Sequence, residues 1–143
     1  MPYPPDLVKP MKEDLTRLGI RELLTEEDVD AALLPKSGTA LLVINSVCGC
    51  AAGNARPGIT MALENPVLPD RRFTVFAGQE LAATERARRY LSGYPPSSPS
   101  IALFRDGQLV MMMERKDIEG CSAHEVAGKL RAAFDAHCVA QPR

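Results

Sequence analysis

Residues 39–53 read Thr39-Ala40-Leu41-Leu42-Val43-Ile44-Asn45-Ser46-Val47-Cys48-Gly49-Cys50-Ala51-Ala52-Gly53, an apolar run that leads into two cysteines and several small residues. An apolar run without polar alternation is typical of a strand buried on both faces of a parallel sheet. The small residues continue into the apolar positions of residues 59–63, which favours a helix packed closely against that sheet. The stretch therefore predicts a central strand, a turn that carries the cysteines, and a helix that Pro57 kinks.

Downstream of this helix, strand and helix patterns alternate. A strand, an amphipathic helix and two more strands are predicted at residues 73–77, 80–91, 100–104 and 109–113. Asp106-Gly107 between the last two strands is a strong hairpin signal. The run Ser122-Ala123-His124-Glu125 has the spacing of a capping box and opens a final helix. The order β-α-β-α-β-β-α predicts an α/β fold with a central mixed sheet flanked by helices.

The N-terminal segment has a different pattern from the rest of the chain. Apolar residues recur at helical spacing between residues 6 and 35, and Thr25 precedes three acidic residues as a helix N-cap would. We therefore expect an N-terminal helical extension over residues 1–36, followed by the main domain over residues 37–143. A chain of 143 residues is the size of one domain, so the two parts should form one compact unit.

Composition and charge exclude several classes of function. Lys and Arg total 17 against 18 Asp and Glu, so no strong field attracts nucleic acid or an anionic membrane. The N-terminus lacks a basic and apolar leader, and no stretch approaches the ~20 apolar residues that cross a bilayer. We expect a soluble cytoplasmic protein. The 4 cysteines of such a protein indicate redox chemistry or metal binding more than a disulfide framework.

The chemistry is expected at Cys48-Gly49-Cys50. Backbone N–H groups and the helix dipole at the start of a helix stabilise a thiolate, which makes Cys48 the candidate nucleophile and Cys50 the candidate resolving cysteine. Side chains two positions apart on a helix diverge by about 200°. Closing a disulfide between the two cysteines should therefore require Cys48 to lie outside the helical turn and Gly49 to adopt a conformation that residues with a side chain disfavour. Such strain would make the pair a weaker reductant than a Cys-x-x-Cys pair.

Pro99 is the second candidate element of the site. It immediately precedes a predicted strand, where the Ser98-Pro99 bond can be cis, although a trans turn proline is the commoner alternative. A proline at this place would leave the preceding backbone free to pair with an extended substrate and would keep the cysteines from collecting a metal. Asn45 and Ser46 either hydrogen-bond the cysteine turn or only end the strand.

A metal site is the main alternative for the cysteine pair. Zinc, copper and iron-sulfur sites need about four ligands. The other soft ligands are Cys121, His124, His137 and Cys138. The one compact pair among them is His137-Cys138, and adjacent residues of a helix point about 100° apart. Cys138 is better interpreted as a small hydrophobe on the apolar face of the last helix. Six arginines could help to bind an anionic thiol, but solvated surface charge is the default interpretation, so none is assigned to thiol binding. They are Arg56, Arg71, Arg72, Arg86, Arg88 and Arg89.

The sequence from Asn45 to Gly53, followed by Ala55-Arg56-Pro57, resembles the bacilliredoxins. The resemblance continues through Thr74-Val75-Phe76-Ala77-Gly78-Gln79, Pro96-Ser97-Ser98-Pro99-Ser100, Ile118-Glu119-Gly120 and residues 133–138, and so covers nearly the whole chain. It implies a thioredoxin-like fold with an added N-terminal helical segment. Cys121 is outside the family pattern, and its role is open.

The resemblance also implies an activity. Bacilliredoxins remove bacillithiol from proteins that carry it as a mixed disulfide, and isomerase activity is attributed to them. The family's nucleophile role falls on Cys48 and its resolving role on Cys50. The expected partners are proteins with thiol mixed disulfides and a small thiol as co-substrate, with no bound cofactor or metal. A non-enzymatic redox-sensing or metal-binding module is the alternative.

Overall fold

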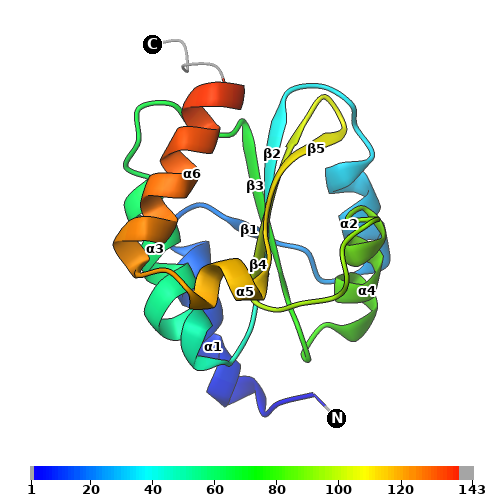
Figure 1. Ribbon diagram of the computed structural model, residues 1–143. Coiled ribbons are helices and arrows are strands. Elements are labelled where there is room, and N and C mark those ends of the chain that lie inside the picture. Colours follow the sequence, from blue (N-terminus) through cyan, green and yellow to red (C-terminus); the bar gives the residue numbers. More distant parts are fainter. Residues whose placement is uncertain (1, 139–143) are drawn as a thin grey trace.

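The computed structural model describes residues 2–138, which fold around one five-stranded sheet (Figure 1). The order of the strands across the sheet is β1-β3-β2-β4-β5. The strands are β1 (Arg21–Glu22), β2 (Thr39–Asn45), β3 (Arg71–Phe76), β4 (Ser100–Arg105) and β5 (Gln108–Met113). β3 runs parallel to β1 and β2, whereas β4 is antiparallel to both β2 and β5. The sheet is therefore mixed, as the sequence predicts.

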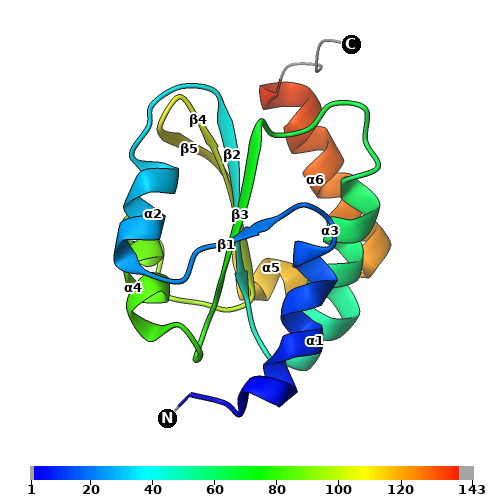
Figure 2. The same cartoon turned by 180° about the vertical axis from the view of Figure 1, so that it is seen from behind.

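Helices cover both faces of the sheet. They are α1 (Pro5–Thr16), α2 (Glu26–Leu33), the π-helical turn η1 (Ala51–Ala55), α3 (Arg56–Ala62), α4 (Leu81–Arg89), α5 (Arg115–Glu119) and α6 (Ala123–His137). Figures 1 and 2 show α1, α3 and α6 on one side of the sheet and α2 and α4 on the other. One apolar core fills each side, and β2 lies between the cores with all its residues buried.

The elements predicted downstream of residue 38 are confirmed within a few residues. α6 begins after Ser122, whose hydroxyl accepts the Glu125 N–H while the Glu125 carboxylate accepts the Ser122 N–H. Thr25 caps α2 with a capping box of the same kind. Pro57 lies at the start of α3. The sequence predicts a kinked helix here, and the structure has a π-helical turn, η1, that changes into the α-helix α3. Local capping and turn signals thus placed these helices correctly.

Two short elements escape the prediction. β1 spans two residues and α5 spans five, which is too short for either a two-residue or a 3.6-residue periodicity to emerge. β1 pairs with β3 through Arg21 and Glu22, so residues 1–36 are not purely helical. Leu15 and Ile20 enter one core, and Leu23 and Val29 enter the other. The boundary after residue 36 stays a prediction, and residues 139–143 of the predicted domain lie outside the described part of the chain.

The topology gathers three chain segments at one end of the sheet. β2 ends at Asn45, and the cysteines follow directly. β4 begins at Ser100, which pairs with Ile44 near the end of β2. Because β2 and β4 are antiparallel, the loop before β4 and the turn after β2 leave the sheet at the same end. β5 ends at Met113, opposite Ile101, and brings the start of α5 to this end as well.

Candidate active site

Cys48 lies in the turn between β2 and the helix that follows. Gly49 and Cys50 are already helical, whereas Cys48 precedes the first helical turn. Its carbonyl oxygen accepts the N–H groups of Ala51 at 3.1 Å and Ala52 at 3.2 Å. The prediction that Cys48 sits outside the helical turn is confirmed. Both cysteines are partly exposed.

In this structure the two cysteines are reduced, and Gly49 does not show the conformation that is predicted for the closed Cys48–Cys50 disulfide. Gly49 is helical, it is not among the glycines with positive φ, and a Cβ placed on it would meet no atom within 4 Å. The turn at Cys48 alone directs the two side chains toward each other, so no left-handed residue is needed between them. The strain expected in the closed disulfide, and the weaker reducing power that would follow from it, stay predictions.

The environments of the two sulfurs differ although the atoms are only 2.6 Å apart. Burial raises the pKa of Cys48, but hydrogen bonds from Cys50, from Ser46 and from the backbone N–H groups of Ala51 and Cys50 outweigh it and lower that pKa. Burial raises the pKa of Cys50, and the hydrogen bond to Cys48 and the negative charge there raise it further. The pair therefore holds its first negative charge on Cys48.

Asn45 and Ser46 do more than end the strand. The Ser46 hydroxyl accepts the Cys48 N–H at 3.3 Å, and Asn45 Oδ1 accepts the Ser46 N–H at 2.9 Å. Both side chains are buried. Arg56, read from the sequence as surface charge, is also buried, with 5% of its surface exposed. The interpretation as solvated surface charge is therefore wrong for Arg56, whose buried guanidinium forms an ion pair with Asp14 of α1.

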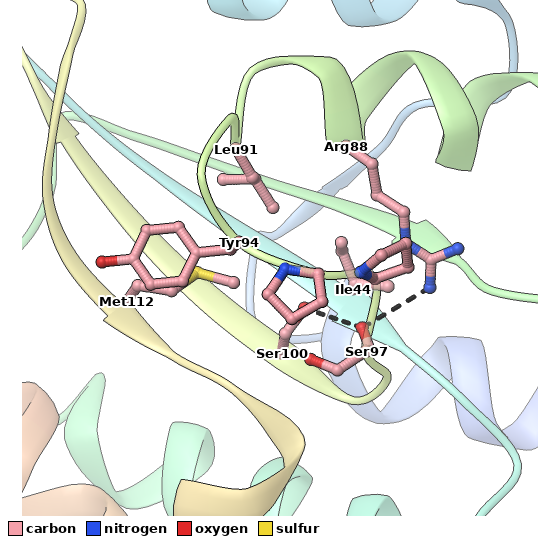
Figure 3. A pocket seen from close by; sticks show the side chains of 9 residues that line it. Ile44, Arg88, Leu91, Tyr94, Ser97, Ser100 and Met112 are labelled. Atoms are coloured by element: carbon pink, nitrogen blue, oxygen red, sulfur yellow. Dashed lines mark hydrogen bonds between the residues drawn. The ribbon is translucent and has the colours of Figure 1, made fainter.

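Pro99 follows a cis peptide bond and is buried at the start of β4. The trans alternative is therefore wrong. Ser97 Oγ accepts the Arg115 N–H at 3.3 Å, which ties the loop before Pro99 to α5. The Ser97 carbonyl accepts hydrogen bonds from the Ser100 hydroxyl and from Arg88 (Figure 3). These residues border a small pocket whose lining includes Ile44, Leu91 and Met112. The part that Pro99 plays in binding substrate stays a prediction.

Arg115 is a residue at this end of the sheet that sequence reasoning missed. It begins α5 with an exposed side chain, and its Nε lies 3.5 Å from Glu119 Oε2. The negative charges of Cys48 and then Cys50 raise the pKa of Arg115, so this cation lies within electrostatic range of the sulfur pair. Asn54 of η1 holds α5 in place by donating to the Ile118 carbonyl at 3.1 Å. The capping residues Glu114 and Asp117 were the available sequence signal for this helix.

The remaining two cysteines are not part of the sulfur pair. Cys121 is buried in the core beneath α6, and Cys138 packs partly against the same core. Burial raises the pKa of Cys138. Within residues 2–138, no group of three or more His, Cys, Asp or Glu side chains is arranged to hold a metal ion. Over the same range, no helix is long and apolar enough to cross a bilayer.

Comparison with solved structures defines the class of the fold as thioredoxin-like. A thioredoxin of Malassezia sympodialis superposes with a TM-score of 0.56 at 13% identity, covering 82% of this chain and 90% of that one. The Fasciola hepatica thioredoxin gives a TM-score of 0.54 at 20% identity, covering 82% and 99%. At this identity the likeness establishes the fold.

Sequence comparison then identifies the family. Residues 3–138 match the protein family described as Disulphide isomerase. A bacilliredoxin of Salinibacter ruber is 58% identical over 96% of this chain and 82% of its own, and one of Koribacter versatilis is 52% identical over 96% and 95%. A bacilliredoxin of Staphylococcus aureus is 48% identical over 95% and 93%. The chain belongs to the bacilliredoxin family, and family and fold together support thiol-disulfide oxidoreductase activity.

Proposed function

We propose that this protein removes bacillithiol, or a similar small thiol, from protein mixed disulfides, with Cys48 as nucleophile and Cys50 as resolving cysteine. The observation that carries the proposal is the asymmetry of the pair: hydrogen bonds lower the pKa of Cys48 in spite of its burial, whereas the pKa of Cys50 is raised. The thiolate is the attacking species in disulfide exchange. The bacilliredoxin relatives support the choice of a mixed-disulfide substrate.

The proposed reaction has two exchange steps. In the first, the Cys48 thiolate attacks the small-thiol sulfur of the mixed disulfide, so that a Cys48–small-thiol disulfide forms and the substrate protein leaves as a thiolate that takes up a proton. In the second, Cys50 loses its proton and attacks Cys48 Sγ, which releases the small thiol and leaves a Cys48–Cys50 disulfide. Two external thiols then reduce the Cys48–Cys50 disulfide by two successive exchanges and leave joined as a disulfide. No bound cofactor or metal takes part.

Two neighbouring groups fit this reaction. The exposed Arg115 guanidinium offers a cation to an anionic small thiol such as bacillithiol, close to the sulfur that Cys48 attacks. The loop that ends at cis Pro99 offers backbone groups to an extended substrate chain at the same end of the sheet. The proposed place of action is the cytoplasm, where proteins keep their thiols reduced and mixed disulfides need removal.

Disulfide isomerisation is a second candidate activity. The family that matches residues 3–138 is described as Disulphide isomerase, and the same Cys48 thiolate can attack a misplaced protein disulfide. Isomerisation returns the cysteine pair to its reduced state at the end of each cycle. Recovery of activity by a scrambled, fully oxidised test protein, with no added reductant, would measure it.

The test of the proposal compares two substrates. Wild type should release small thiol from a bacillithiolated test protein much faster than it reduces insulin-type disulfides, and Cys48→Ala should do neither. Cys138→Ala is the matched control, because Cys138 is a partly buried cysteine outside the sulfur pair. Retained activity in Cys48→Ala, or preferential insulin reduction by wild type, would overturn the proposal. Stoichiometric metal in the purified protein would instead favour the metal-binding alternative.

A further inference from the structure

Arg56 is a buried cation that begins α3, eight positions after Cys48 in the sequence. Its Nη1 donates to Asn45 Oδ1 at 3.0 Å and to the Ser46 carbonyl at 2.9 Å. Its Nε donates to Asp14 Oδ2 of α1 at 3.2 Å. One side chain therefore connects α1, α3 and the residues that precede the cysteines.

Burying a guanidinium costs free energy, and a residue that served only to fill space would not need a charge. A buried charge loses its hydration, and an apolar side chain of similar volume in the same place is often equally or more stabilising. Arg56 recovers the cost only through a carboxylate and two oxygens held at hydrogen-bond distance. Both of those oxygens belong to the two residues that lead into the cysteine turn.

The contacts fix both peptide groups of Ser46. The Ser46 carbonyl accepts from Arg56, and the Ser46 N–H donates to Asn45 Oδ1, the atom that Arg56 also holds. Asn45 is anchored from its other side, since its Nδ2 donates to the Met11 carbonyl of α1 at 3.1 Å. With both of its peptide planes held, Ser46 has a defined orientation for its hydroxyl, which meets the Cys48 N–H.

We propose that Arg56 is a positioning residue for Cys48, which it serves by clamping the peptide groups of Ser46 so that the Ser46 hydroxyl stays directed at the Cys48 turn. The inference rests on the proposed function only in taking Cys48 as the nucleophile. Burial has the largest effect on the pKa of Cys48 and raises it. The hydrogen bond from Cys50, followed by the one from the Ser46 hydroxyl, lowers that pKa. Asp14 offsets the charge of Arg56, so the effect travels through Ser46.

The test measures how fast iodoacetamide alkylates Cys48 between pH 5 and 10, with peptide mass spectrometry of the full-length protein. The variants are Arg56→Met, Arg56→Lys, Ser46→Ala and the double variant Arg56→Met with Ser46→Ala. Arg131→Met is the matched control, because Arg131 also donates to a backbone carbonyl, that of Met61 toward the far end of α3, at 2.7 Å. Melting temperatures are recorded for every variant.

We expect Arg56→Met and Ser46→Ala each to move the midpoint of the alkylation profile to higher pH. The rate at pH 7 should fall about threefold, because a thiolate of higher pKa is scarcer but intrinsically more nucleophilic. The rate at high pH should not fall. The double variant should match Ser46→Ala alone, since the two changes break the same chain of contacts. Arg56→Lys should give a smaller shift, because one amine reaches only part of the oxygens that the guanidinium holds.

Several outcomes would overturn the inference. A lower melting temperature with an unmoved profile in Arg56→Met would show a structural role only. A shift that is equally large with and without the Ser46 hydroxyl would show that Arg56 acts through its charge. If Arg56→Met does not fold, Arg56→Lys and Ser46→Ala still decide the matter, and an unmoved profile in both contradicts the proposal. Alkylation needs no disulfide substrate, so these results stay separate from a failure of the proposed function.

Discussion

Cys50 of the pair after β2 and the two cysteines near α6 share one core, whereas Cys48 is set apart from them by its hydrogen-bond partners. Cys50, Cys121 and Cys138 all belong to or pack against the core on the α1, α3 and α6 side of the sheet. Burial acts in the same direction on Cys48, Cys50 and Cys138, since it raises each pKa. What separates Cys48 is the set of hydrogen-bond donors around its sulfur. We therefore expect the reactivity of these cysteines to follow from the hydrogen-bond partners of each sulfur more than from its burial.

The largest effect that would sharpen this comparison is expected from Cys50→Ala. Removal of Cys50 eliminates the second exchange step, so the small thiol should accumulate on Cys48 as a stable adduct. Turnover should drop to the slow rate at which free thiol resolves that adduct. Intact-protein mass spectrometry after exposure to a bacillithiolated test protein measures the adduct, and added free thiol should remove it. The comparison breaks down if the adduct appears on Cys121 or Cys138 instead.

A second, intermediate effect concerns the order in which the four cysteines react. The pKa of Cys48 is lowered, whereas those of Cys50 and Cys138 are raised, so the thiolate of Cys48 should appear first as the pH rises. Alkylation at stepwise increasing pH, followed by peptide mass spectrometry, should label Cys48 at the lowest pH. Cys50 should follow at higher pH, and it should react earlier in Cys48→Ala, which removes the negative charge that opposes its ionisation.

The sequence of labelling can also contradict the account. If Cys121 reacts before Cys48 in the folded protein, the donors around Cys48 do not control reactivity. Labelling in denaturant is the control, because it removes burial and hydrogen bonding and should bring the four thiols close to the same ordinary pKa. A difference that persists in denaturant would point to effects of neighbouring residues along the chain.

Much of the fold could be predicted from local sequence patterns. β2 shows as a continuous apolar run, and α6 begins at a capping box that lies within four consecutive residues. β1 could not be predicted, because its two residues become a strand only by pairing with β3, about fifty positions later. The same holds for α5, whose five residues are held by the carbonyl contact to Asn54.

The candidate site was predictable where it depends on neighbours along the chain. The strand-to-helix position of Cys48 and the proline before β4 both follow from adjacent residues. Arg56 was misread because its partners come from α1 and from the end of β2, which only the tertiary fold brings together. Gly49 is helical in the reduced pair, and its conformation in the closed disulfide stays a prediction.

The smallest effect is expected from Gly49→Ala, which tests whether the pair depends on a conformation that only glycine adopts. Gly49 is helical and a Cβ there meets nothing within 4 Å, so alanine should leave the rate of thiol removal unchanged. The free energy of unfolding should stay the same or rise by about 0.5–1 kcal/mol, because alanine restricts the unfolded chain and favours the helix.

Gly58→Ala is the contrasting variant for this last experiment. A Cβ on Gly58 would lie 2.6 Å from Val126 Cγ1 and 3.0 Å from the Ala123 carbonyl oxygen, where α3 crosses α6. Urea denaturation should show a loss of about 1–3 kcal/mol from this overpacking. If Gly49→Ala instead loses most of its activity while its stability is kept, a step of the reaction demands a Gly49 conformation that the reduced pair does not adopt. The donors around Cys48 would then account for the formation of its thiolate but not for turnover.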